Sequence, residues 1–419
     1  MSFQQGLSGL SAASTNLDVI GNNISNANTP GYKQSQAQFT DIFANSLGGA
    51  VSSNTQVGSG SRVSTVAHIF SQGNISPTNN PLDIAINGQG FFRMDDGGSI
   101  SYSRNGQFRL DGNGFVTDAN GINLTGFTAD GNGVIDASQP TKLKLSTADI
   151  PPQVTSTYDM GFNLDSRQSA PTVTTFDANN LKSYSNTTSG TIYDSLGNSH
   201  ILSIYFQKSA TSGTWNTYAT VDGKVDTAGA PIGVTLASTA LTFDNSGALT
   251  APTAAFDVTV DLATINPALG AGSPLTFALD LTTATQFGSG FSVNSLSQDG
   301  FTSGRLSGFT TSAEGVVQGS YSNGQTKSLG QIVLANFINP QGLNPMGDGR
   351  WLETPSSGQP VVGPPKTGTL GALQASATED ANVDLTSELV KMITAQRMYQ
   401  ANAKSIETQD AVLQTLVNL

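Results

Sequence analysis

The two ends of the chain carry apolar residues at heptad spacing, and this pattern constrains the fold more than any other feature. Near the carboxyl terminus the apolar positions step by four and three residues, and neither Gly nor Pro follows Gly371. Such a sustained pattern predicts one long helix with a coiled-coil seam. Gln396 and Asp410 interrupt the seam, where polar residues fix register at some cost in stability. The packing positions are Leu385, Leu389, Met392, Tyr399, Ala403, Ile406, Leu413 and Val417.

A shorter pattern of the same kind opens the chain and predicts a second helix, which should stop at Asn28-Thr29-Pro30-Gly31. An isolated helix is marginal in water, so each apolar stripe needs a partner. The two helices could pair within one chain, but further apolar residues lie off both stripes. The pattern therefore favours contacts with neighbouring copies. The packing positions at this end are Phe3, Leu7, Leu10, Leu17 and Ile24.

The sequence between the two helices changes to a period of two. Apolar and polar residues alternate in 82–87, 256–262 and 277–281, which predicts half-buried strands. Asn-Gly and Asp-Gly pairs between 105 and 133 are typical of tight hairpin turns. The expected fold class is therefore mainly β with α-helical ends. It has antiparallel β-domains in the middle, one discontinuous and one inserted, and coiled-coil helices at both termini.

Proline and glycine punctuation suggests where the domains begin and end. Pro151-Pro152 and the pair Gly288 and Gly290 bracket a middle stretch that is rich in Thr, Ser and Ala. The expected parts are a terminal helical domain (1–30 and 383–419), connecting segments (31–71 and 358–382), a discontinuous β-domain (72–146 and 289–357) and an inserted outer β-domain (147–288).

Composition excludes several classes of partner. The formal net charge is −12 with only 18 Lys plus Arg, whereas nucleic-acid binding needs clustered cations. No apolar run approaches the roughly 18 residues of a membrane span, so we expect neither a nucleic-acid partner nor membrane insertion. The first basic residue is Lys33, so the amino terminus lacks the charged region of a cleaved secretory signal. If the protein is exported, we expect another route.

Few residues are candidates for chemistry. The loops that begin at Asp111 and Asp130 resemble calcium loops, but Phe115 and Val134 stand where the fifth-place oxygen ligand belongs, so hairpin turns explain them better. His68 and His200 are the only histidines and have no neighbouring Cys or second His. A metal site or a Ser-His triad has little to build from. We expect no catalytic residue, no metal site and no cofactor.

The sequence contains several long motifs. They are NNISNANTPGYK at 22–33, GQGFFRM at 88–94, YSRNGQFRLDGNGFVTDANGINLTG at 102–126, LGQIVLANFINPQGLNPMGDGRWLETPSSG at 329–358, and the segment 381–419. These motifs resemble those of the bacterial flagellar rod and hook family. Together they cover both ends and the discontinuous domain. The motif residues at the two ends are Asn22, Asn23, Asn26, Asn28, Thr29, Pro30, Gly31, Tyr32, Asn382, Asp384, Gln396 and Arg397.

The resemblance implies a structural subunit and not an enzyme. Beyond the parts shared with rod subunits, the chain has an insert of about 140 residues that resembles the outer domain of hook subunits. We therefore expect a homo-polymer in which the terminal helices form the inner tube of a curved, extracellular hook, a universal joint that transmits torque from rod to filament. The implied partners are the distal rod, the hook cap, the hook-length control protein, the hook–filament junction protein and the type III export apparatus.

Three alternatives stay open. The nearest is a distal rod subunit, a rigid relative that would form a straight polymer. The β-rich middle could instead serve as an extracellular adhesin or glycan-binding module, for which the terminal helices would be unnecessary. An enzyme acting on polysaccharide would need a pair of carboxylates in a cleft, and sequence distance alone does not exclude such a pair.

Overall fold

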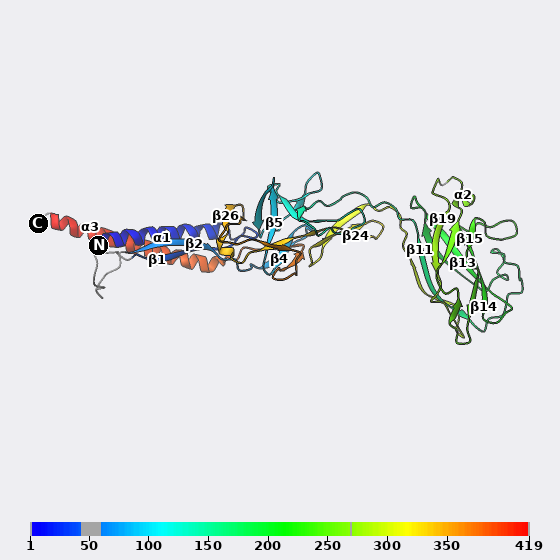
Figure 1. Ribbon diagram of the computed structural model, residues 1–419. Coiled ribbons are helices and arrows are strands. Elements are labelled where there is room, and N and C mark those ends of the chain that lie inside the picture. Colours follow the sequence, from blue (N-terminus) through cyan, green and yellow to red (C-terminus); the bar gives the residue numbers. More distant parts are fainter. Residues whose placement is uncertain (1, 43–59, 269, 418–419) are drawn as a thin grey trace. The chain divides into compact units, whose positions relative to one another are not determined.

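The computed structural model describes residues 2–42, 60–268 and 270–417. The chain divides into two compact units. The first unit comprises Met1–Thr147, Ser307–Ser320 and Thr326–Leu419, and the second comprises Ala148–Leu306 and Tyr321–Gln325. The fold class is mainly β with helices at both termini, as the sequence predicted (Figure 1).

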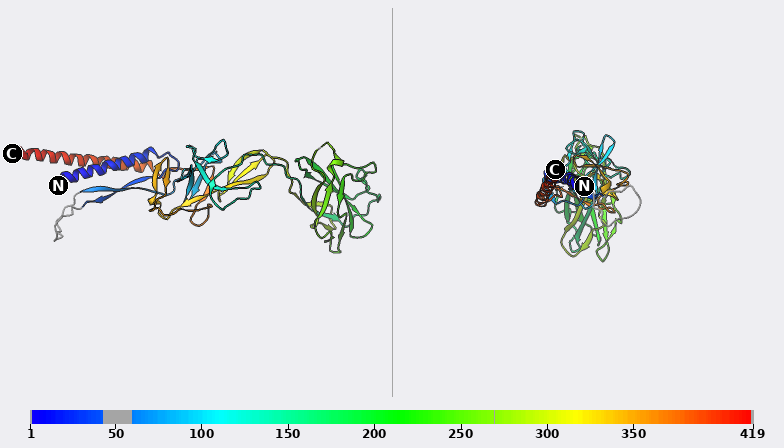
Figure 2. Two further views of the ribbon diagram at one scale, coloured as in Figure 1. Left: turned by 45° about the horizontal axis from the view of Figure 1, so that its top comes forward. Right: turned by 90° about the vertical axis from the view of Figure 1, so that its left-hand side faces the viewer.

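The two long helices of the first unit lie side by side (Figures 1 and 2). Helix α1 spans Ser2–Ser25 and ends just before the predicted stop signal. Helix α3 spans Leu385–Val417 and is preceded by Asp384, whose Oδ1 accepts the backbone N–H groups of Thr386 and Ser387 at 2.9 and 3.2 Å. This is an N-cap, which satisfies donors that the first helical turn leaves unpaired.

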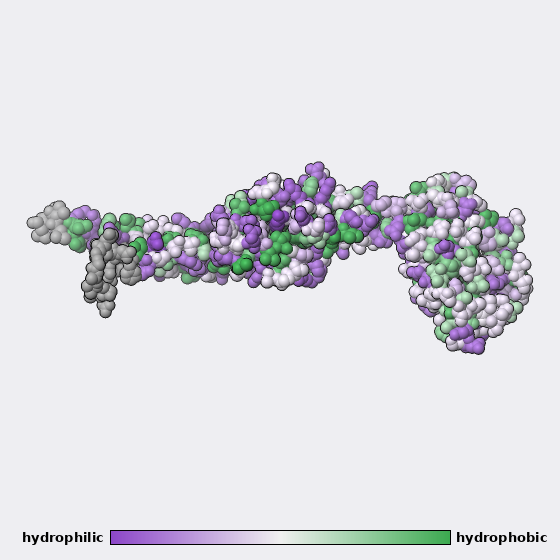
Figure 3. Space-filling view, in the orientation of Figure 1, coloured by the Kyte–Doolittle hydropathy of each residue, from purple (hydrophilic) through white to green (hydrophobic). Residues whose placement is uncertain are grey.

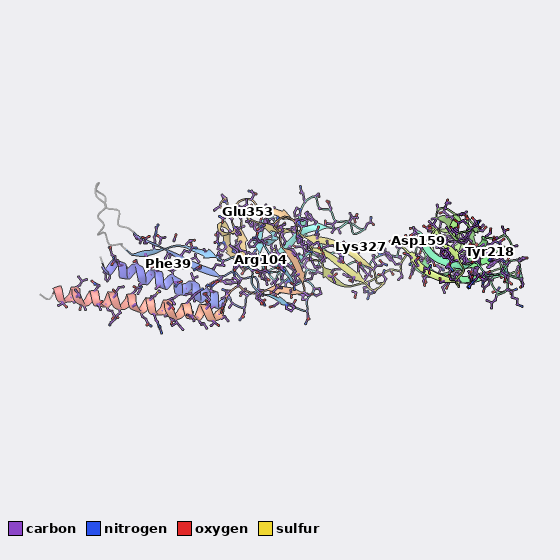
Figure 4. All side chains as sticks on the ribbon, turned by 90° about the horizontal axis from the view of Figure 1, so that it is seen from below. Phe39, Arg104, Asp159, Tyr218, Lys327 and Glu353 are labelled. Carbon is purple, nitrogen blue, oxygen red and sulfur yellow. The ribbon has the colours of Figure 1, made fainter. Side chains whose placement is uncertain are left out.

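A β-hairpin packs along α1. Its strands are β1 (Ser35–Asp41) and β2 (Ser61–His68), paired antiparallel with Ser35 opposite His68. Phe39 of β1 lies beside the helical pair in Figure 4 and is 43% exposed. The hairpin occupies much of the expected connecting segment 31–71, whose residues 43–59 lie outside the described residues.

The rest of the first unit is β-rich. Its main sheet follows the order β22-β23-β24-β9-β5-β6-β27-β26, with β10, β25, β28, β7 and β8 joined beside this path. The elements are β3 (Ile75–Pro77), β4 (Ile84–Asn87), β5 (Phe91–Asp96), β6 (Ser99–Ser103), β7 (Arg109–Leu110), β8 (Val116–Thr117), β9 (Asn123–Thr128), β10 (Thr141–Lys142), β22 (Leu306–Thr311), β23 (Val316–Tyr321), β24 (Thr326–Ile332), β25 (Leu334–Asn336), the 3-10 helix η1 (Pro340–Gly342), β26 (Asn344–Gly347), β27 (Arg350–Leu352), β28 (Val361–Gly363), β29 (Ala372–Ala375) and β30 (Ala377–Glu379).

The segment 358–382 differs from the simple connection that the sequence suggested. Strand β28 pairs with β25, β29 pairs with β4, and β30 pairs with β3. These three strands thus find their backbone partners within the β-rich part, and Leu373 joins its core beside Ile86, Phe92 and Leu124. The segment belongs to the body of the first unit.

The second unit contains two sheets that share one core. One sheet has the order β15-β18-β19-β11-β20, with β21 paired to β11, and the other has the order β12-β13-β14-β16-β17. Phe162, Phe206, Trp215 and Phe277 are at most 1% exposed in the shared core. The elements are β11 (Thr157–Asp165), β12 (Asn186–Tyr193), β13 (Ser199–Lys208), β14 (Thr214–Val221), β15 (Val234–Leu236), β16 (Ala240–Phe243), β17 (Leu249–Ala251), β18 (Phe256–Val260), α2 (Leu262–Ile265), β19 (Leu275–Asp280), β20 (Thr285–Phe287) and β21 (Ser292–Gln298).

Strand β11 has strand partners on both of its sides in the second unit. It pairs parallel with β19 and β20, whereas most other strands of the chain pair antiparallel as predicted. On its other side β11 pairs antiparallel with β21, and Gln153 bridges Phe301. This return pairing places 289–306 with the second unit, although the glycine punctuation suggested a boundary after 288.

Candidate assembly site

The predicted apolar stripe on α3 is only partly covered. Leu385, Leu389 and Leu413 are 43%, 50% and 53% exposed, and Tyr399 is 38% exposed. Met392 and Ile406 of the same stripe are half-buried, Ala403 likewise, and Gln396 is exposed. The side chain of Val417 lies outside the described residues. Most of the large residues on this stripe are therefore available for contacts beyond the chain.

The stripe on α1 shows the same division. Phe3 and Leu7 are 45% and 52% exposed, whereas Leu10, Leu17 and Ile24 are half-buried. Figure 3 shows hydrophobic residues among polar ones along the helical pair. The first turns of α1 therefore add to the apolar surface that α3 presents.

Small residues make the contact between the two helices. A Cβ at Gly6 would lie 2.9 Å from Cγ1 of Ile406, and a Cβ at Gly9 would lie 2.8 Å from Nδ2 of Asn402. Ala13 and Ala395 are buried, at 7% and 2% exposure. The helices therefore approach closely along glycine and alanine, and this seam is offset from the leucines of the predicted stripe. Heptad counting weights large apolar residues and so does not detect it.

The motif at the end of α1 forms a buried polar joint. The Asn23 side chain, 1% exposed, donates from Nδ2 to the Ser35 carbonyl at 2.8 Å and to Glu388 Oε2 at 3.1 Å. Its Oδ1 accepts the Ser35 N–H at 2.9 Å and the Tyr32 hydroxyl at 3.1 Å. Burial raises the pKa of Tyr32, and the Glu388 carboxylate raises it further. The joint ties α1, the hairpin and α3 together.

The other motif residues complete the turn after α1. Asn26 Nδ2 donates to the Asn22 carbonyl at 3.0 Å, Thr29 Oγ1 donates to Asn26 Oδ1 at 3.3 Å, and the Tyr32 hydroxyl donates to Asn22 Oδ1 at 2.8 Å. Asn28 is exposed and Pro30 is half-buried. These bonds are local, so they shape the exit from the helix.

Gly31 is fixed by a close backbone approach. Its φ is +72°, and a Cβ would lie 2.5 Å from the Asn105 nitrogen and 2.7 Å from the Arg104 carbonyl carbon. Only glycine tolerates both the left-handed conformation and this distance. The motif therefore packs directly against the β-rich part of its own unit.

A buried charge cluster lies beside this contact. Lys33 Nζ is 2.6 Å from Glu379 Oε1, and both side chains are fully buried. Arg104 Nε is 3.4 Å from Glu379 Oε2, and Arg104 is 4% exposed. Burial lowers the pKa of Lys33 and of Arg104, while Glu379 favours the charged form of each. We call these three residues the Lys33 cluster. It joins residues that are far apart in the sequence.

The motif at the start of α3 holds the hairpin. Asn382 Oδ1 accepts the Gln34 N–H at 2.7 Å, and its Nδ2 donates to the Ile69 carbonyl at 2.7 Å. Asp384 caps the helix. Gln396 and Arg397 are exposed on α3. The structure thus brings the two end motifs together at the joint, except for these two residues.

Sequence reasoning missed the acidic partners of this joint. Glu388 is 1% exposed, and its Oε1 accepts Gln34 Nε2 and Lys391 Nζ, each at 2.7 Å. In the sequence it looks like an acidic residue that favours a helix start by charge alone. The one available signal was that charged residues are scarce in this chain: only 11% of residues are charged, and Lys33 is the first basic residue.

The candidates for chemistry have structural partners. Asp111 Oδ1 accepts the N–H groups of Asn113 and Phe115, and Asp130 Oδ1 accepts those of Asn132 and Val134. These are turn-stabilising bonds of aspartate. Within 2–42, 60–268 and 270–417, no group of three or more His, Cys, Asp or Glu side chains is placed to hold a metal ion.

The histidines lie in different surroundings. His200 lies in the second unit with Nδ1 2.8 Å from Asp222 Oδ2 and Nε2 3.5 Å from Asp194 Oδ2. In the first unit, His68 Nδ1 is 3.1 Å from Ser35 Oγ, and burial lowers the pKa of His68.

Among the described helices, none has the length and apolar character that a membrane span requires.

Four family models match successive parts of the chain. The model of the flagella basal body rod protein matches residues 3–33, and the flagellar hook protein FlgE/F/G D1 domain matches 85–158. The flagellar basal body protein FlaE D2 domain matches 163–301, and the flagellar basal body rod FlgEFG protein C-terminal model matches 374–419.

Relatives with the same name match over full length. The flagellar hook protein FlgE of Escherichia coli K12 is 41% identical over 423 residues, covering all of both chains. That of Borreliella burgdorferi is 33% identical over 452 residues, covering 100% of this chain and 99% of its own. A solved structure of Helicobacter pylori flagellar hook protein FlgE2 aligns with a TM-score of 0.48 at 15% identity, covering 73% of this chain and 99% of that chain.

Proposed function

Because this chain belongs to the flagellar hook protein family, we propose that its terminal helices form the inner wall of a tube built from many copies. The chain is a structural subunit of the flagellar hook, and the rod and adhesin alternatives are not favoured by these full-length relatives. The proposed subunits join by a heterologous contact whose rotation does not close, which produces an open helical polymer.

The exposed apolar residues of α3 carry this proposal. Besides the stripe residues, Val390, Ile393 and Met398 are 59%, 51% and 56% exposed. A large apolar surface of this kind marks a protein contact, and fully burying one such side chain contributes roughly 1.5–3 kcal/mol. The seam with α1 uses Ala395, Asn402 and Ile406 of α3, so other copies are the partners that we assign to the exposed apolar residues.

The remaining roles rest on family membership. In this proposal the tube is curved and extracellular, works as a universal joint, and has no enzymatic activity. Its neighbours are the distal rod, the hook cap, the hook-length control protein and the hook–filament junction protein. The type III apparatus exports the chain without a cleaved signal.

The test is assembly by substituted full-length chains, followed by electron microscopy and sedimentation. Leu389→Gln with Ile393→Gln should raise the critical concentration for tubes roughly tenfold or more, because two apolar side chains lose their partners. The control is Lys404→Gln with Glu407→Gln, two residues that are 75% and 66% exposed on the same helix. Unchanged assembly by the leucine–isoleucine variant, with normal circular dichroism, would refute the proposal.

A further inference from the structure

An apolar groove of about 330 Å³ lies where the helical pair meets the hairpin in the first unit. Ala12, Ala13 and Ala395 line it, and the last two are buried. Phe39, labelled in Figure 4, and Met398 also line it and are 43% and 56% exposed. None of the described residues that line the groove is charged. The groove can therefore take an apolar side chain without burying a charge.

The carboxyl end of α3 extends past the start of α1 (Figure 2). Gly6 lies against Ile406 and Gly9 lies against Asn402, so the two helices are antiparallel. Helix α1 begins four residues before Gly6, which corresponds to four residues after Ile406. Residues 411–417 therefore have no part of α1 beside them. We call 411–417 the α3 overhang.

The α3 overhang is rich in apolar residues and carries no charge. Its sequence is AVLQTLV. Val412 and Leu413 are 55% and 53% exposed. A short helical end without packing is marginal in water, because burial of an apolar face supplies most of the stability of a helix. The overhang therefore needs a partner that α1 cannot supply.

The groove and the α3 overhang complement each other between copies. Leu413 is 15 residues after Met398, or roughly 22 Å along α3 at about 1.5 Å per residue, so the overhang of a copy does not reach its own groove. We infer that Val412 and Leu413 of one copy dock in the groove of a second copy. This inference rests on the proposed polymer.

Such a contact would repeat without closing. It joins two different surfaces, so each added copy leaves one groove and one overhang free, as an open helical polymer requires. For parallel copies the docking sets an offset of roughly 22 Å along the helices.

Disulfide cross-linking of the full-length chain under assembly conditions tests the docking. The chain contains no cysteine, so only introduced thiols can react. Ala12→Cys with Leu413→Cys in one chain should give a ladder of covalent oligomers, because each copy then links to one copy at its groove and another at its overhang. Each single variant can give dimers at most. A disulfide needs Cα atoms within about 7 Å, so the two positions do not pair within one chain.

The matched control is Ala12→Cys with Thr415→Cys. Thr415 is exposed on the same overhang, and two residues along a helix turn the side chain by roughly 200°. We expect at least about tenfold more ladder with Leu413→Cys than with Thr415→Cys. No ladder, or equal ladders, would overturn the docking. A ladder with Phe3→Cys but none with Leu413→Cys would assign the groove to the start of α1 and overturn the overhang as its occupant.

Assembly separates this inference from the proposed function. Leu413→Gln should raise the critical concentration for tubes about tenfold, because one apolar side chain loses its site. Unchanged assembly by this variant would overturn the docking alone. An unsubstituted chain that forms no tubes would count against the proposed function, while the ladder, read on whatever complexes form at the same concentration, still decides the docking.

Discussion

Replacing Glu379 by Gln should destabilise the first unit by about 3–5 kcal/mol, the usual cost of removing one partner from a buried ion pair. The Glu379 side chain is fully buried and lies 2.6 Å from Lys33 Nζ and 3.4 Å from Arg104 Nε. Glutamine keeps the volume and can still accept the Gly73 N–H. The substitution therefore removes the negative charge alone and leaves two buried cations facing each other.

The matched control is Glu314→Gln. Glu314 Oε1 also lies 2.6 Å from a lysine nitrogen, that of Lys366, but the two side chains are 55% and 48% exposed. An exposed pair contributes about 0–1 kcal/mol, so burial is the variable under test.

The assay is urea unfolding followed by Trp351 fluorescence in a Trp215→Phe background, because Trp215 belongs to the second unit. Trp351 lies 5.7 Å from the ring of Phe91, over which Arg104 packs. A loss of less than about 1 kcal/mol in Glu379→Gln, or a loss no larger than in the control, would refute the reasoning.

Three further predictions concern the joint and the hairpin. Burial lowers the pKa of His68 below its ordinary 6.5, so the unfolded chain binds the proton more tightly than the folded chain does. The free energy of unfolding should therefore be highest above pH 6.5 and fall as the pH is lowered through the folded-state pKa, as measured by unfolding followed with the fluorescence of Trp351, whose ring lies 6.5 Å from that of His68. The same pH response in His68→Gln would contradict this. Gly31→Ala should cost over about 2 kcal/mol in urea unfolding, against about 1 kcal/mol for Gly121→Ala, which has a similar positive φ but open space; equal costs would remove the clash argument. Asp384→Ala should lower stability by about 1 kcal/mol and reduce the helical circular dichroism of α3, whereas Asp384→Asn should not, and identical losses would exclude capping.

The spacing of apolar residues predicted which parts of the chain are helical and which form strands, because local sequence largely determines secondary structure. The alternation in 256–262 and 277–281 corresponds to β18 and β19, which pair antiparallel. The parallel pairing of β11 with β19 could not be predicted from the sequence, because it depends on which strands meet across a long intervening segment. Strand β21 shows the same limit, since only its pairing with β11 fixes the boundary near 306.

The assembly surface was predictable only in part. Apolar spacing identified Leu389 and Leu413, which are exposed on α3. The seam inside the chain depends on Gly9 and Ala395, whose small size matters only once two helices approach. The Lys33 cluster was missed because its members are distant in sequence, and a charged residue gives no local sign that it will be buried with a partner.

The Lys33 cluster also has a consequence for the order of folding. During synthesis, which begins at the amino terminus, the ion pair of Lys33 and Glu379 cannot form until nine-tenths of the sequence is available, because the two residues are 346 positions apart. Contacts this distant slow folding, because a long loop must close before they form. The second unit needs no residue beyond Gln325. It can therefore fold while the first unit still waits for the carboxyl end.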